Sequence, residues 1–338
     1  MRVARLSAAG VLRLFDEPPP VPGPGESLVR VGAVGLCGSD LHWWQEGSIG
    51  DAQLTRPLVL GHELAGVVIG GARDGERVAV DPARPCWTCP TCLTGHRHLC
   101  PQMRFAGHGD TDGGLRELLT WPDQNLHTLA ADLSLTGGAL LEPLGVAVHA
   151  MDLAHVRLAA TVVVVGAGPI GLLLVQLARA AGATTVVSIE PLAHRRAAAT
   201  AAGATAVLDP TAADARATHA ALEADAVLEV VGGEDAVATA VTAARPGGRV
   251  VLVGIPDDDR TTFQAAAARR KGLTIAVSRR MGDVYPRAMS LVQRGMVDLR
   301  RVVSDHFPLA HVENAFAVAA RRTGLKVVID VSADLAGL

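Results

Sequence analysis

Hydrophobic positions follow two different rhythms along this chain. In the first third, short apolar runs alternate with proline and glycine, a pattern typical of closely spaced strands in a compact β-rich domain. These runs cover 11–14, 28–34, 59–60, 67–69 and 78–80. From about residue 160, runs rich in β-branched residues are separated by helical segments rich in alanine and leucine. They cover 162–165, 185–189, 206–208, 226–231 and 249–253. Strands that alternate with helices predict an α/β domain, a doubly wound parallel sheet covered on both faces.

The last part of the chain returns to a mixed pattern. After an apolar run at 273–277, we expect amphipathic helices near 286–294 and 311–322 and a closing strand at 326–331. We infer that this part rejoins the first domain, which would then be discontinuous. A length of 338 residues suits two domains. The predicted division is 1–145 with 280–338 for one domain and 146–279 for the other.

Composition excludes several classes of function. The formal net charge is −3 with both signs interspersed, and aromatic residues make up only 3%, so a nucleic-acid partner is not expected. The N-terminus lacks the pattern of a secretory signal, which predicts a cytoplasmic protein. The almost wholly apolar stretch 159–178 contains three glycines and a proline. It is therefore read as a buried strand, a tight turn and a helix, and no membrane association is expected.

The glycine-rich sequence Gly166-Ala167-Gly168-Pro169-Ile170-Gly171 follows one predicted strand and opens a helix. Gly166 permits the turn, Gly168 lets a pyrophosphate approach the backbone, and Gly171 lets helix and strand pack closely. Free amides at the start of the helix can bind phosphates. This context predicts a Rossmann dinucleotide-binding domain.

Glu190 ends the second strand of that domain, 19 residues beyond Gly171. A carboxylate there accepts hydrogen bonds from ribose hydroxyls and repels a 2′-phosphate, which favours NAD over NADP. Arg195 and Arg196 follow closely. They could neutralise a phosphate, cover the adenine side or face water, and we include Arg195 among the expected cofactor contacts.

Four of the five cysteines lie in one segment, spaced as Cys86-x2-Cys89-x2-Cys92-x7-Cys100. In a reducing compartment such a cluster indicates metal ligation rather than disulfides. A nucleic-acid-binding zinc ribbon would need a wider basic face, and an iron–sulfur protein would need ferredoxin-like spacing. We therefore predict a structural zinc ion that stiffens a lobe at about 84–102.

The fifth cysteine, Cys37, stands alone in Gly35-Leu36-Cys37-Gly38-Ser39-Asp40. A lone thiolate needs partners from elsewhere in the chain and can leave one coordination position open. The natural partners are His62 and Glu63, which follow a strand-like run. Read separately, His62 would be a core histidine and Glu63 a surface carboxylate.

These motifs together resemble the zinc-dependent medium-chain dehydrogenase/reductase superfamily, and the resemblance covers essentially the whole chain. Within it, the chain looks most like the polyol dehydrogenases for sorbitol, xylitol and L-idonate (5-dehydrogenase). The most telling parts are the segments 37–50 and 142–149. The resemblance implies a GroES-like catalytic domain beside the Rossmann domain, and a homotetramer or homodimer.

By this resemblance, Cys37, His62 and Glu63 would hold a catalytic zinc ion, with water or the substrate completing the shell. Glu142 would be a further ligand or the acceptor for the zinc-bound water. Ser39 and His42 resemble the family's proton relay. Without the resemblance, Ser39 would be an ordinary turn cap and His42 a packing residue.

Substrate residues are also suggested by the resemblance. Trp43 and Trp44 replace the usual tyrosines as flat apolar walls, and Arg279 aligns with an arginine that contacts substrate hydroxyls. Arg280 occupies a place where relatives carry an aromatic residue. It could favour an acidic sugar such as L-idonate, or it could be a solvated or subunit-contact residue.

The sequence thus predicts a zinc-containing dehydrogenase that transfers a hydride from a secondary alcohol of a polyol or sugar acid to NAD, giving a ketone. An alternative substrate is L-threonine, an aminocyclitol or a simple secondary alcohol. A catalytically silent NAD-binding protein would have lost zinc ligands, and none is lost here. A zinc ribbon fused to a Rossmann domain would leave Cys37, His62, Glu63 and Glu142 unrelated.

Overall fold

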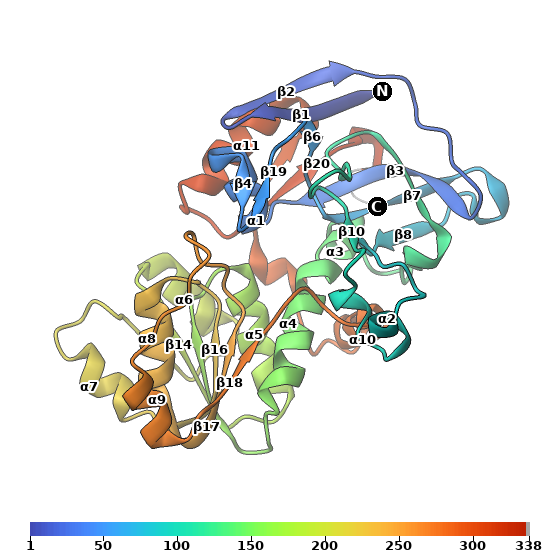
Figure 1. Cartoon of the computed structure of the whole chain (residues 1–338). Coiled ribbons are helices and arrows are strands. Elements are labelled where there is room, and N and C mark those ends of the chain that lie inside the picture. The colour runs from blue at the N-terminus through green and yellow to red at the C-terminus, as the bar shows by residue number, and fades with distance from the viewer. Residues whose placement is uncertain (336–338) are drawn as a thin grey trace. The chain divides into compact units, whose positions relative to one another are not determined.

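The computed structural model describes residues 1–335, which form two compact units. Unit 1 comprises residues 1–143, 285–293 and the chain from 303 onward. Unit 2 comprises residues 144–284 and 294–302. The end of the predicted segment 280–338, residues 336–338, lies outside the described residues. Figure 1 labels many of the elements of both units.

Unit 1 is built on two sheets. The larger has the order β12-β8-β7-β3-β20-β19, and β11 also pairs with β3. Its strands are β3 (Glu26–Gly35), β7 (Glu63–Ile69), β8 (Arg77–Val80), β11 (Leu118–Pro122), β12 (Leu126–Thr128), β19 (Val303–Pro308) and β20 (Lys326–Asp330). All neighbours are antiparallel except the β19–β20 pair. The smaller sheet has the order β2-β1-β6, formed by β1 (Arg2–Ala8), β2 (Val11–Asp16) and β6 (Leu58–Val59).

Short helices and hairpins complete unit 1. The helices are α1 (Gly38–Glu46), α2 (Pro90–Leu93), α3 (Leu135–Ala139), α10 (Tyr285–Gln293) and α11 (Val312–Ala320), and α4 (Leu141–Ala154) begins here. The hairpins are β4 (Ser48–Ile49) with β5 (Ala52–Gln53) and β9 (Ala83–Arg84) with β10 (Arg104–Phe105). Trp121 and Phe316 are among the largest side chains buried in the core. The expected β-rich domain is confirmed.

Unit 2 contains a six-stranded, all-parallel sheet with the order β15-β14-β13-β16-β17-β18. Its strands are β13 (Thr161–Val165), β14 (Thr185–Ile189), β15 (Ala206–Leu208), β16 (Ala224–Glu229), β17 (Ala244–Leu252) and β18 (Thr274–Val277). The consecutive valines of β13 are all buried, because both faces of the sheet are covered. The sequence-based prediction of a doubly wound sheet is confirmed.

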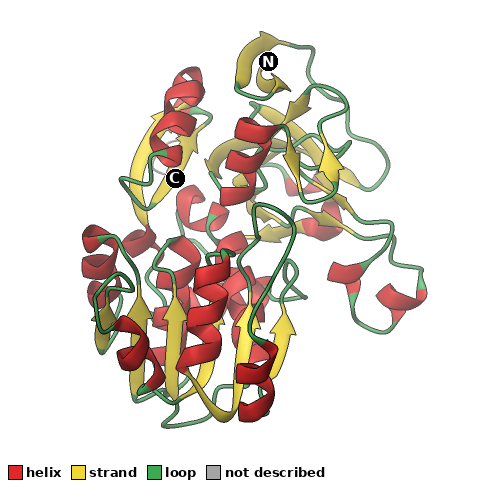
Figure 2. Ribbon diagram, turned by 60° about the vertical axis from the view of Figure 1, so that its left-hand side comes forward, coloured by secondary structure: helices red, strands yellow, loops and turns green. Residues whose placement is uncertain are grey.

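The order of strands reverses on either side of β13, which pairs with β14 on one edge and β16 on the other. Such a switch point opens a crevice at the carboxyl ends of the strands, where ligands bind in this type of sheet. The helices are α5 (Pro169–Ala180), α6 (Ala193–Ala201), α7 (Ala215–Ala220), α8 (Glu234–Ala243) and α9 (Ala265–Lys271). Figure 2 shows helices on both faces of the sheet.

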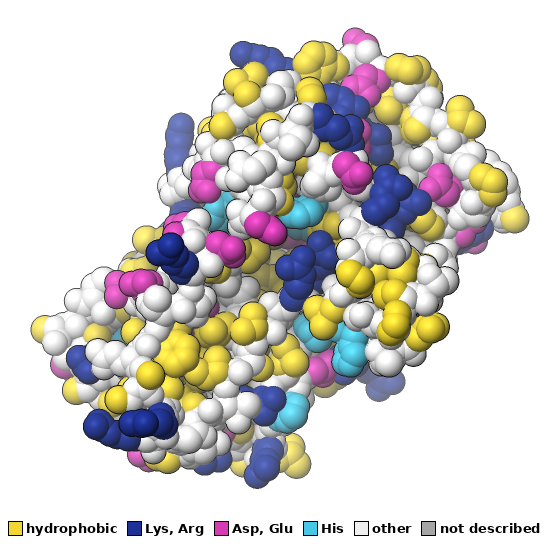
Figure 3. Space-filling model, viewed as in Figure 1, with side chains coloured by type: hydrophobic (Ala, Val, Ile, Leu, Met, Phe, Trp, Pro, Cys, Tyr) yellow, Lys and Arg dark blue, Asp and Glu magenta, His cyan; other side chains and the backbone are white. Residues whose placement is uncertain are grey.

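The apolar stretch 159–178 folds as β13, a glycine turn and the buried helix α5, as expected. Within residues 1–335, no helix is long and apolar enough to cross a membrane. On the face of the molecule seen in Figure 3, basic side chains stand in small groups among acidic and uncharged ones.

Candidate active site

Cys37, His62 and Glu63 lie together at the ends of two neighbouring strands of unit 1. Cys37 stands between the end of β3 and the first residue of α1, and Glu63 is the first residue of β7. These antiparallel strands pair Gly35 with Glu63, so their register brings the thiol beside the His62–Glu63 dipeptide. One ligand atom from each of the three side chains lies within 4.8 Å of the others.

Gly35 makes this close approach possible. A Cβ atom at that position would stand 2.1 Å from Glu63 Oε2 and 3.2 Å from Glu63 Cβ. A larger residue would therefore push the carboxylate away from its place, so the requirement for glycine here is steric rather than conformational.

Asp40 holds the loop that carries His62, a role that the sequence reasoning missed. Its Oδ2 accepts a hydrogen bond from Cys37 N at 2.9 Å, and its Oδ1 accepts one from Gly61 N at 3.1 Å. The same Oδ1 lies 3.5 Å from His62 Nδ1. Burial alone would lower the pKa of His62, but the charge and hydrogen bond of Asp40, together with Cys37, outweigh it and raise that pKa well above its usual value. With Nδ1 facing Asp40, Nε2 is the ring nitrogen left for a cation.

Lys326 is a second residue that the sequence reasoning missed. It is the first residue of β20, it is 3% exposed, and its Nζ donates to Glu63 Oε1 at 2.6 Å and to Leu36 O at 2.8 Å. Burial would lower the pKa of Lys326, but the charges of Glu63 and Cys37 raise it. Glu63 Oε2, also buried, has no hydrogen-bond partner among the described residues.

Glu142 lies on α4 within electrostatic reach of this cluster. It is buried, and burial is the main cause that raises its pKa to about 7. His62 and Lys326 oppose this rise, whereas the charge of Glu63 adds to it. The structure thus brings Glu142 near the three predicted ligands, although it is not part of their closest group.

The cluster fits a zinc ion. A thiol, an imidazole and a carboxylate are the ligand types that catalytic zinc sites use, with one position left open. The buried and unpartnered Glu63 Oε2 is an acceptor that a cation could satisfy. Asp40 and Lys326 are the outer partners that such ligands usually require.

Helix α1 carries the other residues predicted near this site. Ser39 and His42 are partly exposed, and His42 Nδ1 lies 3.3 Å from Glu46 Oε1. Trp44 is partly exposed and packs against Phe316, with ring centroids 5.8 Å apart.

Trp43 requires a correction. Its indole is 2% exposed and belongs to the core of unit 1, where it makes a T-shaped contact with His108, with ring centroids 5.4 Å apart. Asp40 and Trp43, three residues apart, form the buried face of α1, so Trp43 points inward. Trp43 is therefore a core residue rather than a substrate contact, and Trp44 remains the candidate wall.

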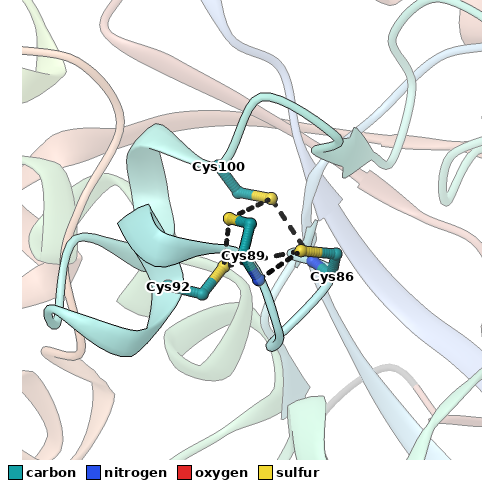
Figure 4. A group of neighbouring side chains, drawn as sticks. All are labelled: Cys86, Cys89, Cys92 and Cys100. Atoms are coloured by element: carbon teal, nitrogen blue, oxygen red, sulfur yellow. Dashed lines mark hydrogen bonds between the residues drawn. The ribbon is translucent and has the colours of Figure 1, made fainter.

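The cysteine quartet closes on itself in one small lobe, as Figure 4 shows. Sulfur atoms lie 3.9 Å apart for Cys86 and Cys92, 3.5 Å for Cys89 and Cys92, and 3.9 Å for Cys89 and Cys100. Four thiolates around one zinc ion at about 2.3 Å would be about 3.8 Å apart. All four sulfurs lie within 4.8 Å of one another, so the quartet also fits a zinc ion.

Backbone hydrogen bonds and burial shift the pKa values of two of these thiols in opposite directions. Cys89 N donates to Cys86 Sγ, and backbone hydrogen bonds from Thr88 and Cys89 lower the pKa of Cys86 to about 6. Burial raises the pKa of Cys92 to about 12. In the same lobe, Arg97 stacks over the ring of Trp87, with its Cζ 4.4 Å from the ring centroid.

The glycine turn of unit 2 has the shape predicted for a phosphate site. Gly166 has a φ of +103°, and a Cβ on Gly171 would stand 2.0 Å from Gly166 O. Gly168 precedes α5, whose first residues are Pro169 and Ile170. A Cβ on Gly168 would meet only Arg195 Nη1, at 3.8 Å. The turn therefore has room for a ligand, and the guanidinium of Arg195 lies beside that space.

Glu190 lies directly after β14 and faces this turn. Its Oε2 accepts from Ala167 N at 2.8 Å and its Oε1 from Leu192 N at 3.0 Å. Each oxygen keeps acceptor capacity for a ribose hydroxyl. Arg279 and Arg280 follow β18; Arg279 is exposed, and Arg280 is partly buried with a φ of +55°.

Comparison with protein families gives two matches. Residues 23–131 match the family described as Alcohol dehydrogenase GroES-like domain. Residues 169–294 match the family described as Zinc-binding dehydrogenase.

Individual proteins are similar over nearly the whole chain. The protein named "Probable D-xylulose reductase A" of Arthroderma otae is 38% identical, covering 95% of each chain. The structure of L-idonate 5-dehydrogenase from Escherichia coli K-12 is 26% identical, with a TM-score of 0.89 over 98% of each chain. A structure from Sinorhizobium meliloti 1021, described as a zinc-binding dehydrogenase bound to NADP, is 31% identical, with a TM-score of 0.90 over 98% of this chain and 99% of that one.

Proposed function

Because the chain belongs to the zinc-binding dehydrogenases, we propose that it oxidises a secondary alcohol of a polyol or sugar acid to a ketone and transfers the hydride to NAD. In this proposal unit 1, close to the predicted ranges 1–145 and 280–338, supplies the chemistry. Unit 2, close to 146–279, binds the dinucleotide.

The convergence of Cys37, His62 and Glu63 within 4.8 Å is the observation that carries this proposal. These residues would hold the catalytic zinc ion, and Glu142 or a water molecule would complete its surroundings. When bound, zinc supplies a Lewis acid that lowers the pKa of a substrate hydroxyl. Asp40 fixes the tautomer and orientation of His62, and Lys326 fixes one oxygen of Glu63.

Side chains of α1 would carry away the proton released from the substrate hydroxyl. Ser39 Oγ would pass it toward the ribose, and the imidazole of His42 would carry it to solvent. The side chain of His42 is 20% exposed and hydrogen-bonded to Glu46, which is consistent with a group that exchanges protons with water.

The glycine turn and Glu190 support the choice of cofactor. Gly166, Gly168, Pro169, Ile170 and Gly171 would receive the pyrophosphate at the start of α5, with Arg195 beside it. Glu190 would accept the ribose hydroxyls. The quartet of Cys86, Cys89, Cys92 and Cys100 would hold a second zinc ion that stiffens its lobe.

The substrate class rests on relatives and on a few side chains. The names of two similar proteins refer to D-xylulose and L-idonate, a ketose and a sugar acid. In this chain, Trp44 would supply an apolar wall, and Arg279 would contact hydroxyl or carboxylate groups.

We propose a homotetramer or homodimer in the cytoplasm. Strand β18 is at the edge of its sheet, and Val277 on it is 77% exposed, which supports contact with another subunit. The five free thiols are compatible with a reducing compartment.

Two cysteine variants test the catalytic assignment. Cys37→Ser should lower the zinc content from two equivalents to one and abolish turnover, while calorimetric NAD binding persists. Cys100→Ser is the matched control: it should also lose one equivalent, but it should mainly lower the melting temperature. Unchanged turnover in Cys37→Ser would remove the catalytic-metal assignment.

A substrate panel tests the rest. With NAD, the enzyme should reduce the cofactor fastest with a pentitol, a hexitol or an aldonate. Faster turnover of L-threonine, an aminocyclitol or a simple secondary alcohol would favour the alternative dehydrogenase.

A further inference from the structure

Arg196, on α6, is fixed by three oxygen atoms at the edge of the dinucleotide site. Its Nη1 donates to Glu190 O at 2.8 Å and to Pro191 O at 2.6 Å. It also lies 3.0 Å from Asp209 Oδ2. The guanidinium therefore does not extend freely into solvent, and its side chain is 22% exposed.

Asp209 is itself held in place. It directly follows β15, and its Oδ1 accepts from Thr211 N at 2.9 Å and from Thr211 Oγ1 at 2.6 Å. These two bonds fix one carboxylate oxygen and leave Oδ2 directed at Arg196. The pair is thus a prearranged contact between α6 and the loop after β15.

The order of the strands separates this pair from the carboxylate of Glu190. In the sheet, β14 lies between β15 and β13. The Glu190 carboxylate reaches toward the turn after β13, where it accepts from Ala167 N. Arg196 binds the backbone carbonyl of the same residue and the carboxylate after β15. Near the predicted ribose, the carboxylate of Glu190 is therefore directed toward the end of β13, whereas the guanidinium of Arg196 is directed toward the end of β15.

This arrangement has a consequence for a 2′-phosphate. Such a group would lie next to Glu190 and would need a cation to offset the repulsion. Arg196 is close in the chain, but turning it toward the phosphate would break its contacts with Asp209 and with two carbonyl oxygens. Arg195, beside Gly168, is on the side of the pyrophosphate turn.

We infer that Asp209 is a specificity-determining residue for the dinucleotide, because it withholds Arg196 from a 2′-phosphate and so adds to the discrimination against NADP by Glu190. The inference rests on the proposed use of NAD. The proposed effect of Asp209 differs from simple repulsion between its carboxylate and the 2′-phosphate, because it requires Arg196.

The test compares binding of NADH and NADPH, which differ only by the 2′-phosphate, to the full zinc-loaded protein by calorimetry at low ionic strength. Asp209→Asn removes the charged partner and leaves Arg196 held by two neutral carbonyl oxygens, so the affinity for NADPH relative to NADH should rise by about five- to tenfold. In Arg196→Met, adding Asp209→Asn should change that ratio by less than about twofold. Thr211→Val, which removes one bond to Asp209, should give a smaller gain in the same direction and decides the matter if Asp209→Asn does not fold.

Asp225→Asn is the charge control. Asp225, on β16, pairs with Arg245 of β17 at 2.7 Å. It stands at the opposite end of β16 from Glu229, so its loss removes the same charge far from the glycine turn. It should leave the ratio unchanged. The inference is overturned if Asp209→Asn leaves the ratio unchanged, if the gain persists without Arg196, or if Asp225→Asn gives the same gain. A natural chain that binds neither NADH nor NADPH would instead refute the proposed function.

Discussion

Replacing Lys326 by methionine tests how the buried charge of Glu63 is balanced. The two side chains are 4% and 1% exposed, and the Nζ–Oε1 distance is 2.6 Å. At that distance and an effective dielectric constant of about 20, their attraction is about 6 kcal/mol, most of which offsets the cost of taking both charges out of water. Removing one partner leaves the other charge buried, which typically costs about 3–5 kcal/mol.

We therefore expect Lys326→Met to lower the melting temperature by about 10 °C, at roughly 2–4 °C per kcal/mol for a unit of this size. The measurement is thermal unfolding by calorimetry, with added zinc and after treatment with a chelator. A cation held by Cys37, His62 and Glu63 would replace the missing positive charge. The loss should consequently be smaller with zinc than without it.

Lys271→Met is the matched control. Lys271 Nζ also makes short hydrogen bonds, at 2.7 Å to Thr242 O and 2.7 Å to Ala244 O, but these acceptors are carbonyls and no buried carboxylate depends on it. Its loss should cost about 1–2 kcal/mol, with or without zinc. Lys326 does not balance the buried charge of Glu63 if Lys326→Met melts within about 2 °C of the natural chain. The same conclusion follows if zinc changes the melting temperatures of the Lys326→Met and Lys271→Met variants equally.

Two further changes probe unit 2. Gly171→Ala would bring a Cβ to 2.0 Å from Gly166 O, so it should lower the free energy of unfolding by about 1–3 kcal/mol and also weaken NADH binding. Gly168→Ala should weaken NADH binding without changing the stability. Thermal unfolding measures the stability and calorimetry the affinity, and equal melting temperatures for the two variants would contradict this prediction. His219, 4% exposed and with no partner for its Nε2 among the described residues, has its pKa lowered by burial. The unfolded imidazole binds a proton below about pH 6.5 that the folded one excludes, so its stabilising contribution is present above that pH and is lost on acidification. His219→Gln should remove this loss, and a urea-unfolding difference from the natural chain that is identical at pH 5 and pH 7.5 would disprove it.

Much of the fold could be predicted from local patterns. Strands β13 and β14 of unit 2 are almost continuously buried runs bounded by helices, so periodicity and length identified them. The cysteine quartet and the glycine turn are also local, because all their residues fall within short segments whose geometry depends on little else. The burial of Trp43 was not predictable, because a helix as short as α1 has too few apolar positions to define its inner face.

The charged partners of the site show how sequence separation limits such reasoning. Asp40 is three residues from Cys37 and accepts from its amide, a capping-box spacing that could have been recognised at the start of α1. Lys326 is 263 residues from Glu63, and no local pattern relates them. Its only signal was a lysine at the start of a mostly apolar strand, which becomes informative only when β20 is known to pair with β3.

Asp209 lies between these two cases. Successive parallel strands end at the same edge of a sheet, so the sequence could have located Asp209, which follows β15, near Glu190, which follows β14. It could not have revealed that α6 turns Arg196 toward Asp209 rather than toward the ribose, because both directions are open to a long side chain at the start of a helix. The discrimination between NAD and NADP at this edge therefore depends on which acceptors bind the guanidinium of Arg196 in the folded unit. A count of acidic and basic residues near the glycine turn does not predict it.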